Sequence, residues 1–181
     1  TAYNRGQVLH RVAELLEGRH AQLVDELVAT GDDATVARAE VDAAVDRLVW
    51  YAGWTDKLTQ VAGSVNPVAG PFFNLTVPEP VGVVAVVAPQ RSALLGLVSV
   101  VAPVLAGGNA AVVVASEARP LPAVTLTEIL ATSDVPPGVV DAGEAGQVEP
   151  VDVQVAGEDG SELGHRPGEQ VDDAGRRISP T

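Results

Sequence analysis

The sequence has no cysteine among its 181 residues. A chain without cysteine has neither a disulfide framework nor a thiolate metal site, and only His10, His20 and His165 offer imidazole ligands. We therefore expect no metal site. The absence of a thiol also excludes any mechanism whose nucleophile is a cysteine of this chain.

Basic residues are also scarce, with 11 Lys and Arg against 24 Asp and Glu and a formal net charge of −13. Such a charge repels phosphate backbones and anionic membrane surfaces, so we expect neither a nucleic acid nor a membrane as partner. The most apolar window, residues 93–106, is too short to span a bilayer and contains Pro103, which indicates a buried core helix. No secretory signal is visible, and we expect a cytoplasmic protein.

Aromatic residues make up only 3% of the chain, although hydrophobic residues make up 46%. The core must then be built from Val, Leu and Ala, which suits parallel strands covered by helices. Residues 3–28 show helical periodicity that Gly18 could interrupt, and a second helix, capped by Thr35, is expected to run to about Leu58. Residues 61–80 are rich in Gly and Pro, which predicts an extended or hairpin connection.

From residue 81 onward the pattern changes to short β-branched runs that alternate with helical segments. It predicts strands at 81–88 and 110–115, helices at 92–105 and 120–132, and a third strand starting at Val139. This order implies right-handed parallel crossovers. We predict an α/β fold with a Rossmann-like parallel sheet, an N-terminal helical pair, and helices on both faces of the sheet.

The chain divides by composition into residues 1–140 and a tail of residues 141–181. The tail is rich in Gly and Pro and carries ten acids against three arginines. Its one periodic feature is the alternation of Val151, Val153 and Val155, which indicates a single strand. We expect that strand to pair with the open sheet edge of this chain or of a neighbour.

A series of ordered landmarks between residues 3 and 140 resembles the aldehyde dehydrogenase family. They are Arg5 with Val8, Leu9 and Val12, then Tyr51-Ala52-Gly53-Trp54, Pro80-Val81-Gly82-Val83, Ala102-Pro103, Gly107-Gly108-Asn109, Ser116-Glu117, Pro120-Leu121 and Pro137-Gly138-Val139. The resemblance covers part of the family's N-terminal NAD-binding domain and leaves out its catalytic domain, as in a truncated member. It implies the same Rossmann-like fold.

The resemblance breaks where the family's chemistry resides. Family members carry Pro-Trp-Asn after the first strand, and this chain has Pro89-Gln90-Arg91. Arg91 thus stands where the family has the amide that helps to hold the oxyanion, and we interpret it as a solvent-facing or ion-paired residue at a helix start. Residues 161–165 are similar to the family's Glu-Leu-Gly-Gly segment, a likeness that we attribute to chance. We assign no catalytic residue.

The resemblance implies NAD as the cofactor, with Ser116 and Glu117 as the candidate binding residues. A family carboxylate just beyond the second strand can accept hydrogen bonds from the adenosine ribose. The alternative for Glu117 is an acid favoured by the dipole of the following helix. Val114 stands in place of the family's Lys, and the phosphate turn is not recognisable, so we expect weak or absent binding.

The function that these features indicate is a catalytically inactive structural or regulatory subunit. We expect it to form a homo-oligomer or a hetero-oligomer, with a full-length aldehyde dehydrogenase paralogue as the natural partner. One alternative is an active NAD(P)-dependent aldehyde dehydrogenase whose missing residues come from a second chain in a composite site. A second alternative is a free-standing nucleotide-binding module.

Overall fold

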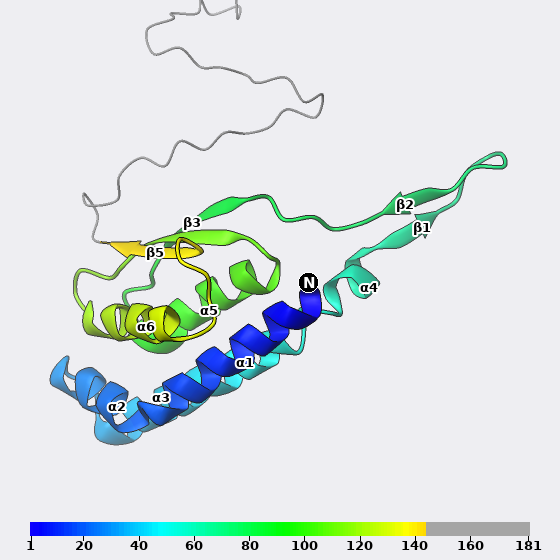
Figure 1. Ribbon diagram of the computed structural model, residues 1–181. Helices are drawn as coiled ribbons and strands as arrows, with labels where there is room; N and C mark the ends of the chain where they lie inside the picture. Colours follow the sequence, from blue (N-terminus) through cyan, green and yellow to red (C-terminus); the bar gives the residue numbers. More distant parts are fainter. Residues whose placement is uncertain (144–181) are drawn as a thin grey trace, which may run out of the picture. The chain divides into compact units, whose positions relative to one another are not determined.

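The computed structural model describes residues 1–143, which begin with three helices (Figure 1). These are α1 (Ala2–Gly18), α2 (His20–Ala29) and α3 (Ala34–Ala52). The helix predicted over residues 3–28 is therefore two helices, because the chain breaks at Arg19, directly after Gly18. The apolar stripes of the three helices pack together and bury Leu9, Leu16, Leu23, Val41 and Leu48.

Both predicted ends of the second helix need correction. The cap of α3 is Asp33 and not Thr35: the Asp33 carboxylate accepts the backbone N–H of Thr35 at 2.8 Å. This hydrogen bond holds the pKa of Asp33 below its usual value, so the cap stabilises α3 while ionised and weakens as the pH falls through that lowered pKa. The helix ends at Ala52 rather than near Leu58, because turns follow from Gly53 and α4 (Leu58–Ala62) is separate.

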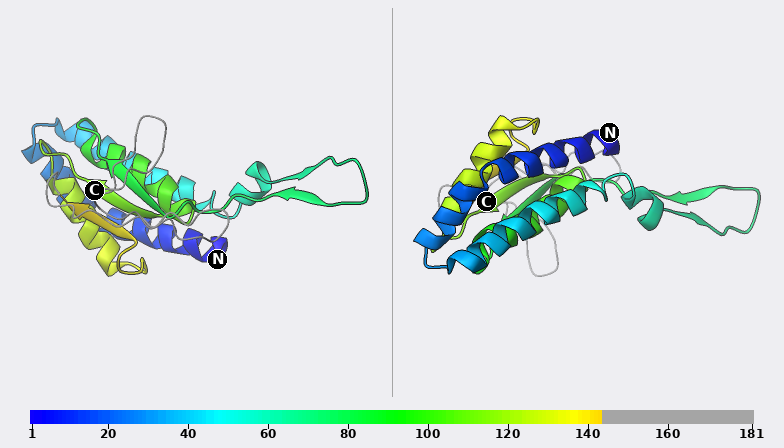
Figure 2. Two further views of the ribbon diagram at one scale, coloured as in Figure 1. Left: turned by 90° about the horizontal axis from the view of Figure 1, so that it is seen from above. Right: turned by 90° about the horizontal axis from the view of Figure 1, so that it is seen from below.

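The segment rich in Gly and Pro contains an antiparallel hairpin, which confirms the expected connection. Its strands are β1 (Ser64–Asn66) and β2 (Asn74–Thr76), and the Asn66 amide donates across them to Asn74 and Thr76 at 2.9 Å. The hairpin extends away from the helices and the larger sheet (Figure 2). Its apolar side chains are exposed, Phe73 by 89%.

The larger sheet confirms the predicted α/β fold. It consists of β3 (Val83–Val87), β4 (Ala110–Val114) and β5 (Val140–Gly143), all parallel and in that order. The crossovers contain α5 (Ala93–Ala106) and α6 (Leu121–Thr132). Strand β5 continues three residues past residue 140, where the composition of the sequence changes. The strand predicted at residues 151–155 lies outside the described residues.

Helices cover only one face of this sheet among residues 1–143, so the prediction that helices cover both faces is wrong there. Val86, Ala111 and Val113 point into the core, whereas Val87 on the other face is 74% exposed. Two right-handed crossovers that advance in one direction place both helices on the same face, and α1 to α3 pack beneath them (Figure 1). The uncovered side, hereafter the open face, carries Val83, Ala85, Val87, Ala110, Val112 and Val114, with Asp141 and Gly143 of β5 beside them.

The first turn of α5 is capped from another helix. Ser92, which precedes α5, has a left-handed backbone with φ 50° and makes no capping hydrogen bond of its own. Instead the buried carboxylate of Glu40 on α3 accepts the N–H groups of Leu94 at 2.9 Å and Leu95 at 3.2 Å. One carboxylate thus satisfies two of the donors that a helix start leaves without partners, and it complements the positive end of the helix dipole.

Replacement of Glu40 by alanine is expected to destabilise the protein. Two N–H groups would lose their acceptor where water has little access, which lowers the free energy of unfolding by about 1–3 kcal/mol. Glu40→Gln keeps an acceptor oxygen and should lose less. Glu17→Ala, an exposed position on α1, is the control and should change little. Urea denaturation measures all three, and equal stability of Glu40→Ala and Glu17→Ala would contradict the role of the cap.

Candidate functional site

The candidate residues gather at the carboxyl edge of the parallel sheet. The loop of residues 88–92 follows β3 and the loop of residues 115–120 follows β4, so both leave the sheet at the same edge. In open α/β sheets ligands bind at this edge. The loops are anchored by two backbone bonds, from Ala88 N–H to the Val114 carbonyl at 2.9 Å and from Ala115 N–H to the Gly143 carbonyl at 3.0 Å.

Ser116 lies in this site, but its hydroxyl is used within the chain. The side chain is buried, and its Oγ donates to Oε1 of Gln90 at 2.7 Å while it accepts the N–H of Arg119 at 3.3 Å. These two bonds tie the loop after β4 to the loop after β3. Ser116 therefore positions the loops, and its side-chain proton already has an acceptor.

Glu117 is the one predicted cofactor residue whose side chain is open to solvent. It is exposed, and its carboxylate makes no hydrogen bond or ion pair with another of residues 1–143. It precedes Pro120, the N-cap of α6, by three residues, and the first turn of α6 contains no acid. A carboxylate placed at the carboxyl edge in this way can accept hydrogen bonds from a ligand hydroxyl.

Arg119 is a site residue that sequence reasoning missed. Its Nη1 pairs with Oδ2 of Asp32 at 2.6 Å, and both side chains are largely buried. The pair fastens the loop after β4 to the turn between α2 and α3. Nothing in the sequence distinguishes Arg119 or Asp32 from other surface charges, because the two positions lie 87 residues apart.

The start of α5 forms the other side of the site. Arg91 is exposed and makes no ion pair within the described part of the chain, which agrees with the prediction that it faces solvent. The positive end of a helix suits an anionic group. Here the Glu40 carboxylate already holds the N–H groups of Leu94 and Leu95, so those two donors are not open to a ligand. The signal that could have revealed Glu40 is an acid on the apolar stripe of α3.

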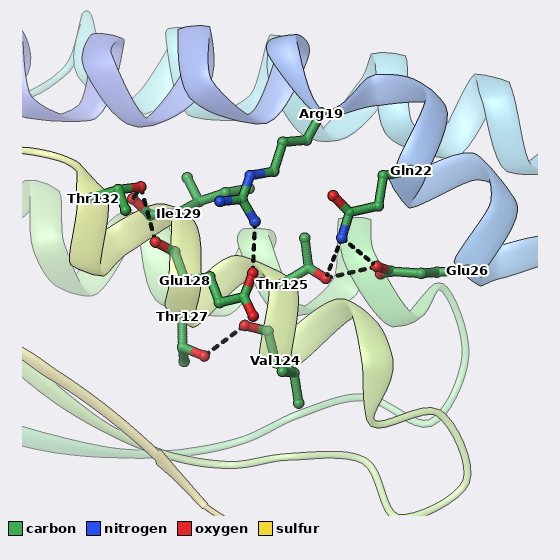
Figure 3. Close-up of polar contacts among 9 residues, drawn as sticks. All are labelled: Arg19, Gln22, Glu26, Val124, Thr125, Thr127, Glu128, Ile129 and Thr132. Atoms are coloured by element: carbon green, nitrogen blue, oxygen red, sulfur yellow. Dashed lines mark hydrogen bonds and ion pairs between the residues drawn. The ribbon is translucent and has the colours of Figure 1, made fainter.

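Polar contacts between α2 and α6 set the position of the loop after β4 (Figure 3). Arg19, at the start of α2, pairs with Glu128 of α6 at 2.7 Å. The Thr125 hydroxyl donates to Oε1 of Glu26 at 2.7 Å and accepts the Gln22 amide at 3.4 Å. These bonds hold α6 against the N-terminal helices, and the loop that leads into α6 is held with it.

The described side chains at this edge offer hydrogen-bonding groups to a ligand. The Ser116 hydroxyl has an amide and a backbone N–H as its neighbours and lacks the adjacent base that would activate it. Residues 1–143 contain no group of three or more His, Asp or Glu side chains placed to hold a metal ion. None of the helices described is long and apolar enough to cross a membrane.

For a dinucleotide the fit is partial. Glu117 offers a free carboxylate where a ribose hydroxyl would need an acceptor, but Ser116 is engaged and Val114 brings no donor. The third strand, β5, ends at Gly143 on the same edge, and residues 144–181 lie outside the described part. The two loops therefore supply the Glu117 carboxylate as an acceptor for a ribose, and the exposed Arg91 is the other charged side chain there without a partner among the described residues.

Comparison with known proteins shows where this sequence and fold recur. The sequence pattern of the aldehyde dehydrogenase family matches residues 1–147. Omega-crystallin of Enteroctopus dofleini is 36% identical over 141 residues, which make up 77% of this chain and 28% of that protein. The mitochondrial aldehyde dehydrogenase of Homo sapiens is 34% identical over 142 residues, or 77% of this chain and 27% of that protein.

Solved structures agree with the sequence matches. PnpE in complex with nicotinamide adenine dinucleotide, a protein of Pseudomonas sp. WBC-3, has a TM-score of 0.73 at 31% identity and covers 78% of this chain and 29% of its own. A NAD-dependent benzaldehyde dehydrogenase from Corynebacterium glutamicum has a TM-score of 0.72 at 29% identity, over 79% of this chain and 32% of its own.

This chain spans less than a third of the length of each of these relatives. The match nevertheless covers most of the present sequence, from the first helix to the third parallel strand. The chain therefore belongs to the aldehyde dehydrogenase family.

Proposed function

We propose that this chain is a catalytically silent structural or regulatory subunit of the cytoplasm that assembles with another chain of the aldehyde dehydrogenase family. The observation that carries the proposal is the open face: a family-type parallel sheet that helices of residues 1–143 cover on one side only. Apolar strands of a parallel sheet are ordinarily buried on both faces. A subunit with such a face is incomplete without a partner.

The lack of catalytic groups supports the proposal that the chain is catalytically inactive. Aldehyde oxidation in this family needs a thiolate to attack the aldehyde and donors that hold the resulting oxyanion. The 181 residues contain no cysteine, and Gln90 and Arg91 stand in the loop after β3. Gln90 accepts the hydrogen bond of Ser116, and Arg91 faces solvent without a nucleophile beside it.

A second exposed apolar surface supports assembly. The hairpin and the chain that follows it expose Phe72, Phe73, Leu75, Val77 and Val81. Both phenylalanines of the chain lie in this segment. Large exposed apolar patches on a protein surface mark interaction sites. A partner of the same family is favoured because the matching segment makes up only about 28% of Omega-crystallin and is there part of a much longer chain.

The alternative of a nucleotide-binding subunit is supported by one specific observation. The exposed carboxylate of Glu117 at the carboxyl edge is suited to a ribose, and PnpE, a relative, has been solved with nicotinamide adenine dinucleotide. A nucleotide-binding subunit would follow from this observation. An active dehydrogenase would need a second chain to supply the thiol in a composite site.

The purified chain is expected to show no NAD(P)-dependent aldehyde oxidation, because no thiol is present to form the hemithioacetal. The measurement is NADH formation with several aldehydes, first with the chain alone and then with a full-length paralogue. Turnover by the chain alone would disprove the silent assignment. A rise in activity per paralogue active site when the chain is added would support either a regulatory subunit or a composite site.

Dinucleotide binding is expected to be weak, because Val114 supplies no donor and Ser116 is engaged. Isothermal titration calorimetry with NAD should detect little heat with the unmodified chain. Glu117→Ala should leave that result unchanged, as should the exposed control Glu79→Ala. A micromolar dissociation constant that only Glu117→Ala removes would establish the nucleotide-binding alternative.

Introduction of a charged side chain on the open face is expected to weaken assembly. Val87→Lys places an ammonium on the apolar surface at the carboxyl end of the edge strand β3, and loss of a buried valine contact alone weakens association about tenfold or more. Light scattering and co-purification with a co-expressed full-length paralogue measure the effect. Val124→Lys, exposed on α6 on the helical side, is the matched control. Equal behaviour of the two variants would mean that the open face is not the interface.

A further inference from the structure

A pocket of about 390 Å³ lies at the amino edge of the sheet, at the opposite end from the candidate site. Four segments form it: the first turns of α1, the end of α5, the turn before β4, and the loop that leads into β5. Pockets that hold small molecules have volumes of about 300–1,000 Å³. The size is therefore sufficient for a small organic ligand.

The walls of this pocket are mostly apolar. Its apolar side chains are Val8, Leu105, Ala110, Val135, Pro136 and Val139. They come from helix, strand and loop, and several of them also pack against the main core. An apolar surface that is concave and backed by the core suits the hydrocarbon part of a ligand.

One cation, Arg5 of α1, is fixed at this apolar surface. Its Nε donates to the carbonyl of Ala106 at 3.2 Å, which holds the guanidinium at the end of α5. Gly108 makes room for it: the backbone there has φ +85°, and a Cβ would lie 3.3 Å from both Cζ and Nη1 of Arg5. The Nη groups make no hydrogen bond to another described residue. The guanidinium is thus oriented with donors to spare, as an anion-binding fork requires.

The acidic side chain of the pocket is Asp134, which stands in the loop before β5. It is exposed, and it forms no ion pair with Arg5 or with another basic side chain among residues 1–143. The arginine therefore remains available to a ligand. A negative charge on the same pocket lowers the affinity for an anion without occupying the donors.

We propose that this pocket binds a small monocarboxylate with an apolar tail. The carboxylate pairs with the Nη groups of Arg5, and the tail lies against Val8, Leu105 and Val139. The proposal is independent of the subunit role, because the pocket lies at the other end of the sheet and shares no residue with the open face apart from Ala110 at its rim.

Hexanoate is the probe, titrated into the full chain by calorimetry or ligand-observed NMR, with hexylammonium as the matched ligand of opposite charge. On a chain of net charge −13, unspecific attraction favours the ammonium. We expect binding of hexanoate in preference to hexylammonium. Arg5→Gln should weaken hexanoate binding about tenfold or more, because a charge-assisted pair is lost. Asp134→Asn should strengthen it severalfold at low salt.

A variant that fills the pocket tests the site without removing the charge. Val139→Phe should abolish hexanoate binding, whereas Val87→Lys on the open face should leave it unchanged, and thermal melting reports whether each variant folds. Preference for hexylammonium, or full binding by Val139→Phe, overturns the proposal. If only Val87→Lys lost hexanoate binding, the hydrocarbon part of hexanoate would bind at the open face and not in the pocket. Weaker hexanoate binding in Asp134→Asn would mean that Asp134 supports the site instead of repelling the carboxylate, and would overturn this arrangement of charges.

Discussion

Helix α5 holds the described part of this chain together, because it packs against α3 on one side and against β3 and β4 on the other. Most of its residues are apolar, and eight of them are buried. Its first turn is closed by the Glu40 carboxylate from α3. Burial of this almost wholly apolar helix between two layers makes the main favourable contribution to the free energy of folding. The buried Glu40 cap fixes the position along α3 at which α5 begins. The N-terminal helices and the sheet are thereby joined into one core.

The same arrangement determines what the carboxyl edge of the sheet can do. The loops after β3 and β4 are tied to each other through Ser116 and Gln90, and to the N-terminal helices through Arg119 and Asp32. Polar side chains that are engaged in such bonds hold the backbone in place, and breaking them to bind a ligand would cost free energy. Glu117 and Arg91 are the charged side chains that remain unengaged at this edge within the described residues. The site therefore has the scaffold of the aldehyde dehydrogenase family with few groups left for chemistry.

The two exposed apolar surfaces and the pocket lie on different parts of the sheet and the hairpin. The open face results from the handedness of the crossovers, which places α5 and α6 on one side. The hairpin exposes its apolar residues because it pairs only with itself among the described strands. The pocket forms at the amino edge, where α1 begins and α5 ends. A subunit that assembles through the first two surfaces can still expose the third to a small molecule.

The sequence by itself determined the order and type of the elements, since periodicity and Gly or Pro placement are local properties. The β-branched runs became β3 and β4, residues 61–80 became a hairpin, and Gly18 ended the first helix. The lack of a cysteine thiol is likewise a matter of residue types alone, which no fold can change. The cap of α3 was misplaced by two residues because Asp33 and Thr35 are both good capping residues.

Only the tertiary structure decided which polar groups remain free and which face of the sheet stays uncovered. Ser116 and Gln90 are 26 residues apart, Glu40 and Leu94 are 54 apart, and Asp32 and Arg119 are 87 apart. Such pairs depend on how helices and strands pack, and no local pattern specifies them. The covered face likewise depends on the direction in which the crossovers advance, which apolar strands alone do not reveal.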